Sequence, residues 1–179
     1  MVVLMPMPDR ILNLGSGQRP MAGAINVDQS PSCHPELVHD LRQFPWPLET
    51  DTFDEVWCQD VVEHLPNTVR TMEEIHRVCR DGATVTILAP HFSCANAFTD
   101  PTHCHFFGSY SFDYFTASSA FPHYSEARFS IKRRSIVFHH SMKDRLIRRL
   151  ANRWPEWYER HLCWICPAWF IQIVLVAQK

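Results

Sequence analysis

Short apolar runs that end at a glycine or an acid recur along the first half of the chain. Residues 10–14 stop at a Gly-Ser-Gly turn, and residues 24–28 and 37–40 each end at an aspartate. Runs of this length, bounded by turn residues, are typical of strands. Further apolar runs predict four more strands, at residues 53–58, 83–89, 129–139 and 170–177.

One segment, residues 67–80, has the helical period. Val69, Met72 and Ile75 fall on one stripe of such a helix. Asn67 is a suitable N-cap, and Gly82 is placed to end the helix. A second, shorter helix is predicted at residues 110–117.

Strands that alternate with connections, one of them helical, predict an α/β fold with a mostly parallel sheet. Ligands of such sheets bind at the carboxyl ends of the strands, where the strand order reverses. In this chain that edge would collect Gly15, Ser16, Gly17, Asp28, Asp40 and Gln59. These positions are therefore the first candidates for a binding site.

The composition fits one globular unit. The chain has 179 residues, of which 46% are hydrophobic, enough for one full core. We expect a single domain over residues 1–179. The seven cysteines are odd in number and scattered, which favours a reduced, cytoplasmic setting. Residues 1–8 are short and interrupted by prolines, so no secretion leader is expected there.

The glycine turn and the two aspartates suggest a nucleoside pocket. Glycines let the backbone approach a ligand closely. The carboxylate of Asp28 can accept hydrogen bonds from both hydroxyls of a ribose, and Asp40 with the backbone of Leu41 can meet an adenine. The third glycine of the dinucleotide fingerprint is missing, so the turn alone is a weak signal.

The motifs LNLGSG, INVD, HDL, FDEVWCQDVVEHL and RVCRDGATVTILAP together cover much of residues 10–120. In this order they resemble class I S-adenosylmethionine-dependent methyltransferases, in particular short bacterial and archaeal members. The resemblance implies a Rossmann-like sheet and S-adenosyl-L-methionine as cofactor. Residues 10–120 would form the cofactor-binding core, and residues 121–179 would add C-terminal strands.

The resemblance also assigns roles. Gly15, Ser16 and Gly17 would pass along the methionine part of the cofactor, with Asn13 standing where many members have an acid. The other cofactor-binding residues would be Asp28, Asp40, Leu41, Gln59 and His64, the last within the Glu63-His64 pair of the family. Asp28 comes only eleven residues after Gly17, which leaves no room for the usual first helix. We therefore expect a reduced set of helices.

The stretch DPTHCHFF, residues 100–107, carries candidates for acid/base work. His91, His103 and His105 lie after the strand at residues 83–89, and histidine is suited to proton removal near neutral pH. Asp100 is placed to orient one of them. We favour a role in the wall of the acceptor pocket, and similar short methyltransferases carry a similar motif.

Other interpretations of these histidines stay open. They can simply pack or cap a loop, or they can bind a divalent ion at Asp100, His103 and His105. Zinc binding that involves the Cys163-Trp-Ile-Cys166 motif is a further alternative, but a second matching pair with finger-like spacing is missing. We assign no metal to the site.

Charge is distributed unevenly. Residues 1–127 carry 16 acidic and 6 basic side chains, whereas residues 128–161 carry 3 and 10. We expect a basic helical insertion at residues 141–161. With its tryptophans, the segment 143–164 is a candidate for peripheral contact with an anionic membrane surface, or for a lid over the acceptor site.

We interpret the chain as an S-adenosylmethionine-dependent methyltransferase that acts on a small-molecule or glycan-type acceptor. Nothing in the sequence resembles a nucleic-acid-binding module, so nucleic acid is not the expected substrate. Two alternatives remain. The first is a non-catalytic protein that binds S-adenosylmethionine, and the second is a metal-dependent enzyme that uses a cluster of His91, His103 and His105.

Overall fold

The computed structural model describes residues 10–139 and 144–179. The prediction for residues 1–8 and the first residues of the predicted basic insertion lie outside these ranges. The strands are β1 (Ile11–Leu14), β2 (Ala24–Asp28), β3 (Leu37–Val38), β4 (Phe53–Gln59), β5 (Cys79–Pro90), β6 (Arg128–Val137) and β7 (Phe170–Gln178). The helices are α1 (Thr68–Val78), α2 (Ala95–Thr99), α3 (Asp144–Arg153) and α4 (Pro155–His161).

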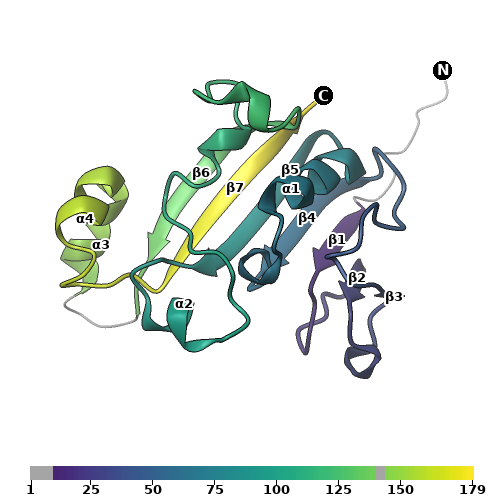
Figure 1. Ribbon diagram of the computed structural model, residues 1–179, viewed down its shortest axis with the longest axis horizontal. Coiled ribbons are helices and arrows are strands. Elements are labelled where there is room, and N and C mark those ends of the chain that lie inside the picture. The colour runs from purple at the N-terminus through teal and green to yellow at the C-terminus, as the bar shows by residue number, and fades with distance from the viewer. Residues whose placement is uncertain (1–9, 140–143) are drawn as a thin grey trace, which may run out of the picture.

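The strands form one seven-stranded sheet in the order β3-β2-β1-β4-β5-β7-β6 (Figure 1). Strands β1 to β5 are parallel, and β7 runs antiparallel to both of its neighbours, β5 and β6. The order reverses between β1 and β4, because β2 lies on one side of β1 and β4 on the other. The predicted α/β fold with a mostly parallel sheet is confirmed, and the sheet has the switch point at which ligands of such folds bind.

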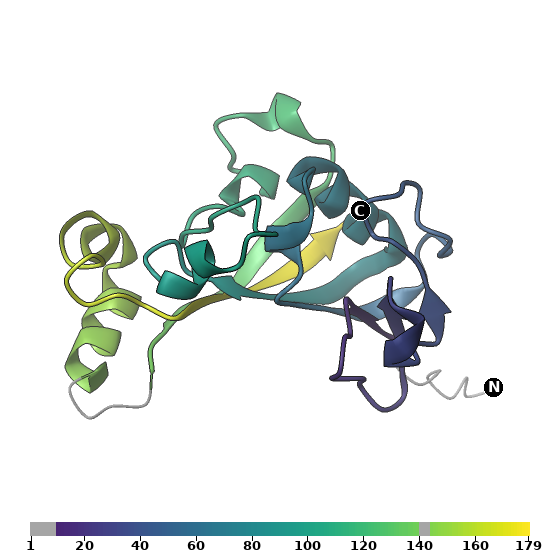
Figure 2. The same cartoon turned by 60° about the horizontal axis from the view of Figure 1, so that its bottom comes forward.

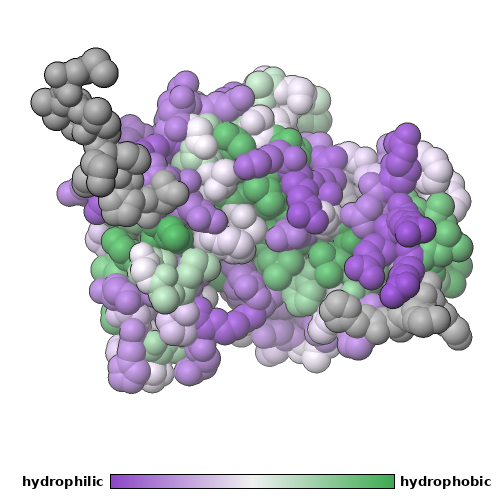
Figure 3. Space-filling model, turned by 180° about the vertical axis from the view of Figure 1, so that it is seen from behind, coloured by the Kyte–Doolittle hydropathy of each residue, from purple (hydrophilic) through white to green (hydrophobic). Residues whose placement is uncertain are grey.

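The two faces of the sheet differ. One face is apolar and buried, and it packs under α1 and the loops that follow β5. In the middle strands it is built from Val56, Val85, Ile87, Ile173 and Leu175. The alternate residues, such as Trp57 and Val174, are only half-buried. Figure 2 shows the reason: within the described residues, no helix covers the opposite side of β4, β5 and β7. Figure 3 shows apolar side chains at the surface on that side.

Helix α1 begins as predicted and ends earlier than predicted. The side chain of Asn67 accepts a hydrogen bond from the backbone N–H of Arg70 at 3.0 Å, as an N-cap should. The helix ends at Val78, not at Gly82. Cys79 is already extended and fully buried, and it pairs with Phe53 of β4. Sheet pairing thus ends the helix before the glycine, which lies inside β5.

Three further segments were predicted to contain or to lack a helix. The connection between β1 and β2 contains turns and no helix, as expected from its length. The predicted helix at residues 110–117 is wrong, because only the single 3-10 turn Asp113–Phe115 forms there. The basic insertion forms α3 and α4, separated at Trp154 before Pro155. They lie at the β6 end of the sheet (Figure 1).

None of the helices in the described ranges is long and apolar enough to cross a membrane.

Candidate active site

A cavity of about 460 Å³ opens where the strand order reverses. Its wall comes from the turns after β1, β2 and β4 and from the loop after β3. Eight of the nine residues expected to bind the cofactor line it: Gly15, Ser16, Gly17, Asp28, Asp40, Leu41, Gln59 and His64. We call this the first cavity.

The glycine turn at the base of the first cavity requires glycine at Gly15. Its φ is +61°, a conformation that side chains rarely adopt. A Cβ at this position would also lie 2.4 Å from Cγ2 of Val61, which is too close for two carbon atoms. Gly17 has φ +48°, but a Cβ there would meet open space. The turn therefore packs tightly against the chain after β4 and leaves the cavity side free.

Asp28 is held rigidly by the turns on either side of it. Its Oδ2 accepts from the backbone N–H of Gly17 at 2.8 Å, and its Oδ1 accepts from the backbone N–H of Ser30 at 2.8 Å. A carboxylate offers about four acceptor sites, so two remain for a ligand. The side chain is thus oriented before any ligand arrives.

Asp40 also lines the first cavity, but its carboxylate has a partner already. Arg42 binds both of its oxygens, from Nε at 2.9 and 3.1 Å and from Nη2 at 2.9 Å. This hydrogen bonding lowers the pKa of Asp40. A ligand must therefore share the carboxylate with Arg42, which also lines the cavity.

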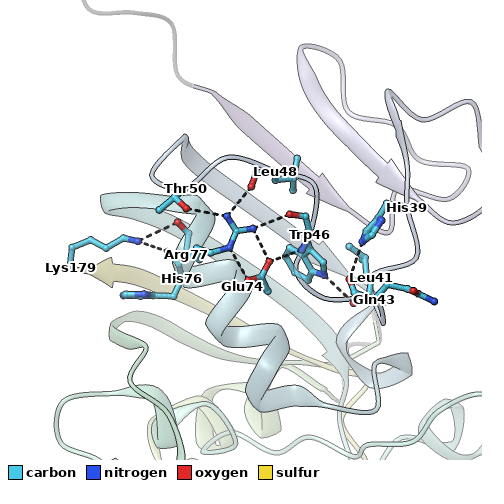
Figure 4. Close-up of polar contacts among 10 residues, drawn as sticks. All are labelled: His39, Leu41, Gln43, Trp46, Leu48, Thr50, Glu74, His76, Arg77 and Lys179. Carbon is cyan, nitrogen blue, oxygen red and sulfur yellow. Dashed lines mark hydrogen bonds and ion pairs between the residues drawn. The ribbon is translucent and has the colours of Figure 1, made fainter.

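The loop that carries Asp40 and Leu41 is fastened to α1 by hydrogen bonds with Glu74 and Arg77, which form an ion pair within that helix (Figure 4). Arg77 donates to the backbone carbonyls of Trp46 and Leu48 at 3.1 and 2.8 Å, and to Glu74 at 2.8 Å. Glu74 in turn accepts from the backbone N–H of Trp46, and the indole of Trp46 donates to the carbonyl of Leu41 at 3.0 Å. These contacts fix the outer wall of the cavity.

Asn13 is the exception among the expected residues, because it does not line the first cavity. Its side chain is buried and donates to Oδ1 of Asn26 at 2.8 Å and to the carbonyl of Arg19 at 3.3 Å. Asn26 is its register partner on β2. The amide N–H groups join two parallel strands and the glycine turn, so they are not available to a ligand.

Two charged residues that the sequence analysis did not single out face each other at the first cavity. Nη2 of Arg19 lies 2.8 Å from Oδ2 of Asp60, and both residues line the cavity. Asp60 has φ +54°, directly after the last residue of β4. Its position at a strand end could have identified Asp60 as a candidate from the sequence. Its ion pair with Arg19, 41 residues away, could not have been predicted.

A second cavity of about 550 Å³ adjoins the first. Asp60 and His64 line both cavities, so the two share a wall. The other lining residues of the second cavity are Glu63, Pro90, Asn96, Thr99, Asp100, Pro101, His103 and Phe170. Asp100, Pro101 and His103 of the stretch DPTHCHFF therefore contribute to the wall of this cavity.

Glu63 is the most unusual residue of the second cavity. It is 1% exposed, and neither oxygen of its carboxylate has a hydrogen-bond partner among the described residues. Burial raises its pKa to about 7, with smaller contributions from the charges of Asp60 and Asp100. Such groups are rare, since a buried unpaired carboxylate costs several kcal/mol unless a proton or a cation neutralises it.

A chain of hydrogen bonds sets the tautomer of His64. The hydroxyl of Thr102 donates its one hydrogen to Oδ1 of Asp100 at 2.6 Å, so it must accept from Nδ1 of His64, 2.8 Å away. His64 therefore carries its proton on Nδ1 and leaves Nε2 with a free lone pair. Burial, and next the charge of His103, lowers its pKa.

Of the three histidines proposed as acid/base groups, only His103 lines one of these two cavities. His91 is fully buried away from both cavities and bonds Ser93 and Glu159, because its side chain turns toward α4. His105 binds the carbonyl of Pro66 at 3.1 Å. The predicted cluster of His91, His103 and His105 does not form; in the described ranges the three-residue group of potential metal ligands is Glu63, His64 and His103.

Comparison with known proteins agrees with this geometry. Residues 19–87 match the methyltransferase-domain family. A comparison with curated proteins found no match. The structure resembles the YcgJ protein from Bacillus subtilis with a TM-score of 0.59 and 13% identity, covering 96% of this chain and 92% of the other.

Two further solved structures are similar. An S-adenosylmethionine-dependent methyltransferase from Archaeoglobus fulgidus matches with a TM-score of 0.56 and 16% identity, over 94% of this chain and 86% of the other. A chain from the complex between a Haloferax volcanii methyltransferase and the Trm112 methyltransferase activator matches with a TM-score of 0.59 and 15% identity. The match covers 96% of this chain and 83% of the other. The TM-scores establish the fold, and residues 19–87 add a match to the methyltransferase-domain family: the chain has the Rossmann-like fold of S-adenosylmethionine-dependent methyltransferases.

Proposed function

We propose that the first cavity binds S-adenosylmethionine, that the second cavity binds a small-molecule or glycan-type acceptor, and that the methyl group is transferred where the cavities meet. The observation that carries this proposal is the shared wall. Asp60 and His64 line both cavities, so a group in one can contact a group in the other there. Alignment of two reactants is the main task of such an enzyme.

The residues of the first cavity fit the cofactor. S-adenosylmethionine supplies a methyl group activated on a sulfonium sulfur. The glycine turn offers backbone at close range, and Asp28 keeps two acceptor sites suited to ribose hydroxyls. The amino-acid part of the cofactor has one positive and one negative group, which the pair of Arg19 and Asp60 complements.

The second cavity favours a neutral, hydroxyl-bearing acceptor. Three carboxylates, of Asp60, Glu63 and Asp100, lie in its wall and disfavour a polyanion such as nucleic acid. The amide of Asn96 can hydrogen-bond hydroxyl groups, and the ring of Phe170 offers an apolar face. This combination is suited to a sugar or to a small polar molecule.

His64 and His103 are the groups best placed to act on the acceptor. Nδ1 of His103 must donate to the carbonyl of Ala97, 3.0 Å away, so its Nε2 lone pair is free like that of His64. The two rings meet edge to face at 4.6 Å. Free imidazole lone pairs can take the proton that a hydroxyl or amine loses on methylation.

Isothermal titration with S-adenosylhomocysteine tests the cofactor site. We expect binding by the full chain and a loss of about 10-fold or more in affinity for Asp28→Asn, since a hydrogen bond to a charged group contributes about 1.5–3 kcal/mol. Glu49→Gln is the matched control, because Glu49 is exposed and lies outside both cavities.

Two results would contradict the proposal: no heat of binding from folded protein, or an equal loss in both variants. Turnover of labelled cofactor with panels of sugars, small hydroxyl compounds and RNA then addresses the acceptor. Transfer to RNA alone would overturn the acceptor class, and transfer to any panel would exclude a merely binding protein.

Contact of α3 and α4 with an anionic membrane surface stays a prediction. Trp154, Trp157 and Trp164 are 52%, 47% and 68% exposed, and exposed arginines lie among them. Figure 3 shows hydrophilic and apolar side chains side by side at this end of the molecule. Neither cavity is lined by α3 or α4, so the structure does not place them as a lid. Co-sedimentation with anionic vesicles, against neutral vesicles, tests the contact.

A further inference from the structure

We propose that Glu63, His64 and His103 form a binding site for a divalent first-row transition-metal ion such as Zn²⁺, at the wall shared by the two cavities. One potential ligand atom of each residue lies within 4.8 Å of the others. Zinc is bound at about 2.0–2.2 Å by histidine nitrogen and carboxylate oxygen, which puts neighbouring ligands about 3–4 Å apart. Small side-chain rotations suffice to close that difference.

The tautomers of both histidines are the ones that a metal requires. His64 donates from Nδ1 to Thr102, and His103 donates from Nδ1 to the carbonyl of Ala97. Each ring thus has its proton fixed on one nitrogen by an oxygen acceptor and presents the other nitrogen unprotonated. Metal-binding histidines almost always have this outer hydrogen bond, which orients the ring.

Glu63 independently indicates a cation-binding site. Its carboxylate is buried against the same cluster, and neither oxygen has a partner in the part of the chain that the structure describes. Packing alone does not explain such a group, because an apolar residue would fill the space without the cost of desolvating a charge. A cation bound by the two histidines would supply the partner that the carboxylate lacks.

The ligands come from two segments that are joined directly. The carbonyl of Glu63 accepts from the backbone N–H groups of Cys104 and His105, at 2.9 and 3.3 Å, and from Sγ of Cys104 at 3.3 Å. Glu63 and His64 lie on the 3-10 turn Val62–His64 that follows β4. The stretch that contains His103 is therefore fixed against that turn, so the cluster is preorganised by backbone contacts.

The ligand set favours transition metals over magnesium or calcium. Two imidazoles with one carboxylate suit zinc, manganese or iron, whereas Mg²⁺ and Ca²⁺ prefer oxygen ligands alone. Three protein ligands leave positions open, as in catalytic zinc sites. With the ion bound, the histidine lone pairs are occupied, and a hydroxyl oxygen of an acceptor in the second cavity could fill an open position and be polarised there in place of proton removal by a free imidazole. This role rests on the proposed function; the binding of the ion does not.

The test uses the full chain after treatment with a chelator, titrated with Co²⁺ and followed by the visible bands of the bound ion. We expect one Co²⁺ per chain and its displacement by Zn²⁺. The absence of stoichiometric binding would overturn the proposal. So would a thiolate-to-cobalt charge-transfer band, since that would place the ion on cysteines instead.

Variants locate the ion. We expect His103→Asn and Glu63→Gln to weaken Co²⁺ binding by about 100-fold or more, and Thr102→Val, which removes the outer partner of His64, by about 10-fold. His105→Asn is the matched control from the same stretch and should leave affinity unchanged. Folded variants, checked by circular dichroism, that keep wild-type affinity would overturn the site. The titration needs neither cofactor nor acceptor, so it fails or succeeds separately from the proposed methyl transfer.

Discussion

The described residues contain two groups in which histidine lies beside a glutamate, half-buried Glu159 and buried Glu63, and the groups differ in what is left unpaired. Around Glu159, one carboxylate oxygen, Oε1, has two partners, and both ring nitrogens of His91 are used. Glu159 accepts from Nε2 of His91 at 3.2 Å and from the backbone N–H of Ser109 at 2.7 Å, and the backbone N–H of Ser93 donates to Nδ1 of His91. Around Glu63, the carboxylate has no partner among the residues that the structure describes, and the histidines keep free lone pairs.

The protonation behaviour follows from this difference. Burial acts on both glutamates in the same direction and raises the pKa. At Glu159 the hydrogen bonds from His91 and Ser109 outweigh burial, and the pKa is lowered. At Glu63 burial prevails, and the pKa rises to about 7. The completed group holds α4 against the sheet, whereas the incomplete group at the cavity wall keeps its bonding capacity for a ligand.

The largest effect is expected from replacing the histidine of each group by asparagine. His103→Asn should lower the rate of methyl transfer by about 100-fold or more, because acid/base or metal-assisted steps contribute that much. His91→Asn should leave cofactor binding intact and lower stability instead. Single-turnover rates with labelled cofactor, beside urea denaturation, measure both. Loss of activity in stable His91→Asn would reverse the assignment of the two groups.

Removing the acceptor from the completed group should cost stability only. Glu159→Ala leaves the N–H of Ser109 and the ring N–H of His91 without partners, each worth about 1–3 kcal/mol. We expect a loss of about 2–3 kcal/mol in the free energy of unfolding and unchanged affinity for S-adenosylhomocysteine. Glu156→Ala, on the exposed side of the same helix, is the control. A large loss of affinity in Glu159→Ala would contradict a purely structural role for Glu159.

The smallest effect is a pH dependence. Because the folded pKa of Glu159 is lowered, its charge stabilises the protein above the unfolded pKa of a glutamate, and that stability is lost as pH falls through the folded value. His91 and Cys163 are the titratable groups that face it. Glu159→Gln should therefore be about 1 kcal/mol less stable than wild type at pH 7. The difference should vanish in acid; a constant difference down to pH 3 would contradict this.

Features that depend on residues close together in the chain were predicted from the sequence. Six of the seven strands were placed to within a few residues at each end, and the glycine turn, Asp28, Asp40 and Gln59 line one cavity, because strand ends in a parallel sheet meet at one edge. The cap at Asn67 was also visible, since its partner is three residues away.

What escaped prediction depends on partners far along the chain. His91 looked like an active-site residue from its place after β5, but its orientation is set by Glu159, 68 residues later. Nothing in the sequence indicated that Asn13 has a partner, but its side chain donates to Asn26 on the next strand. The meeting of Glu63, His64 and His103 likewise needs the contact between residues 63 and 104. Periodicity and spacing carry no information about such pairs.

The place of β7 in the sheet has a consequence for the order in which the chain acquires structure. β7 is the last of the seven strands to be synthesised, yet it lies between β5 and β6 and pairs with both along most of its length. While the ribosome adds the residues between them, β6 has no neighbouring strand, and one edge of β5 is open. Strands β1 to β5 can pair during this interval. The half that binds the cofactor can therefore be assembled before the sheet is closed.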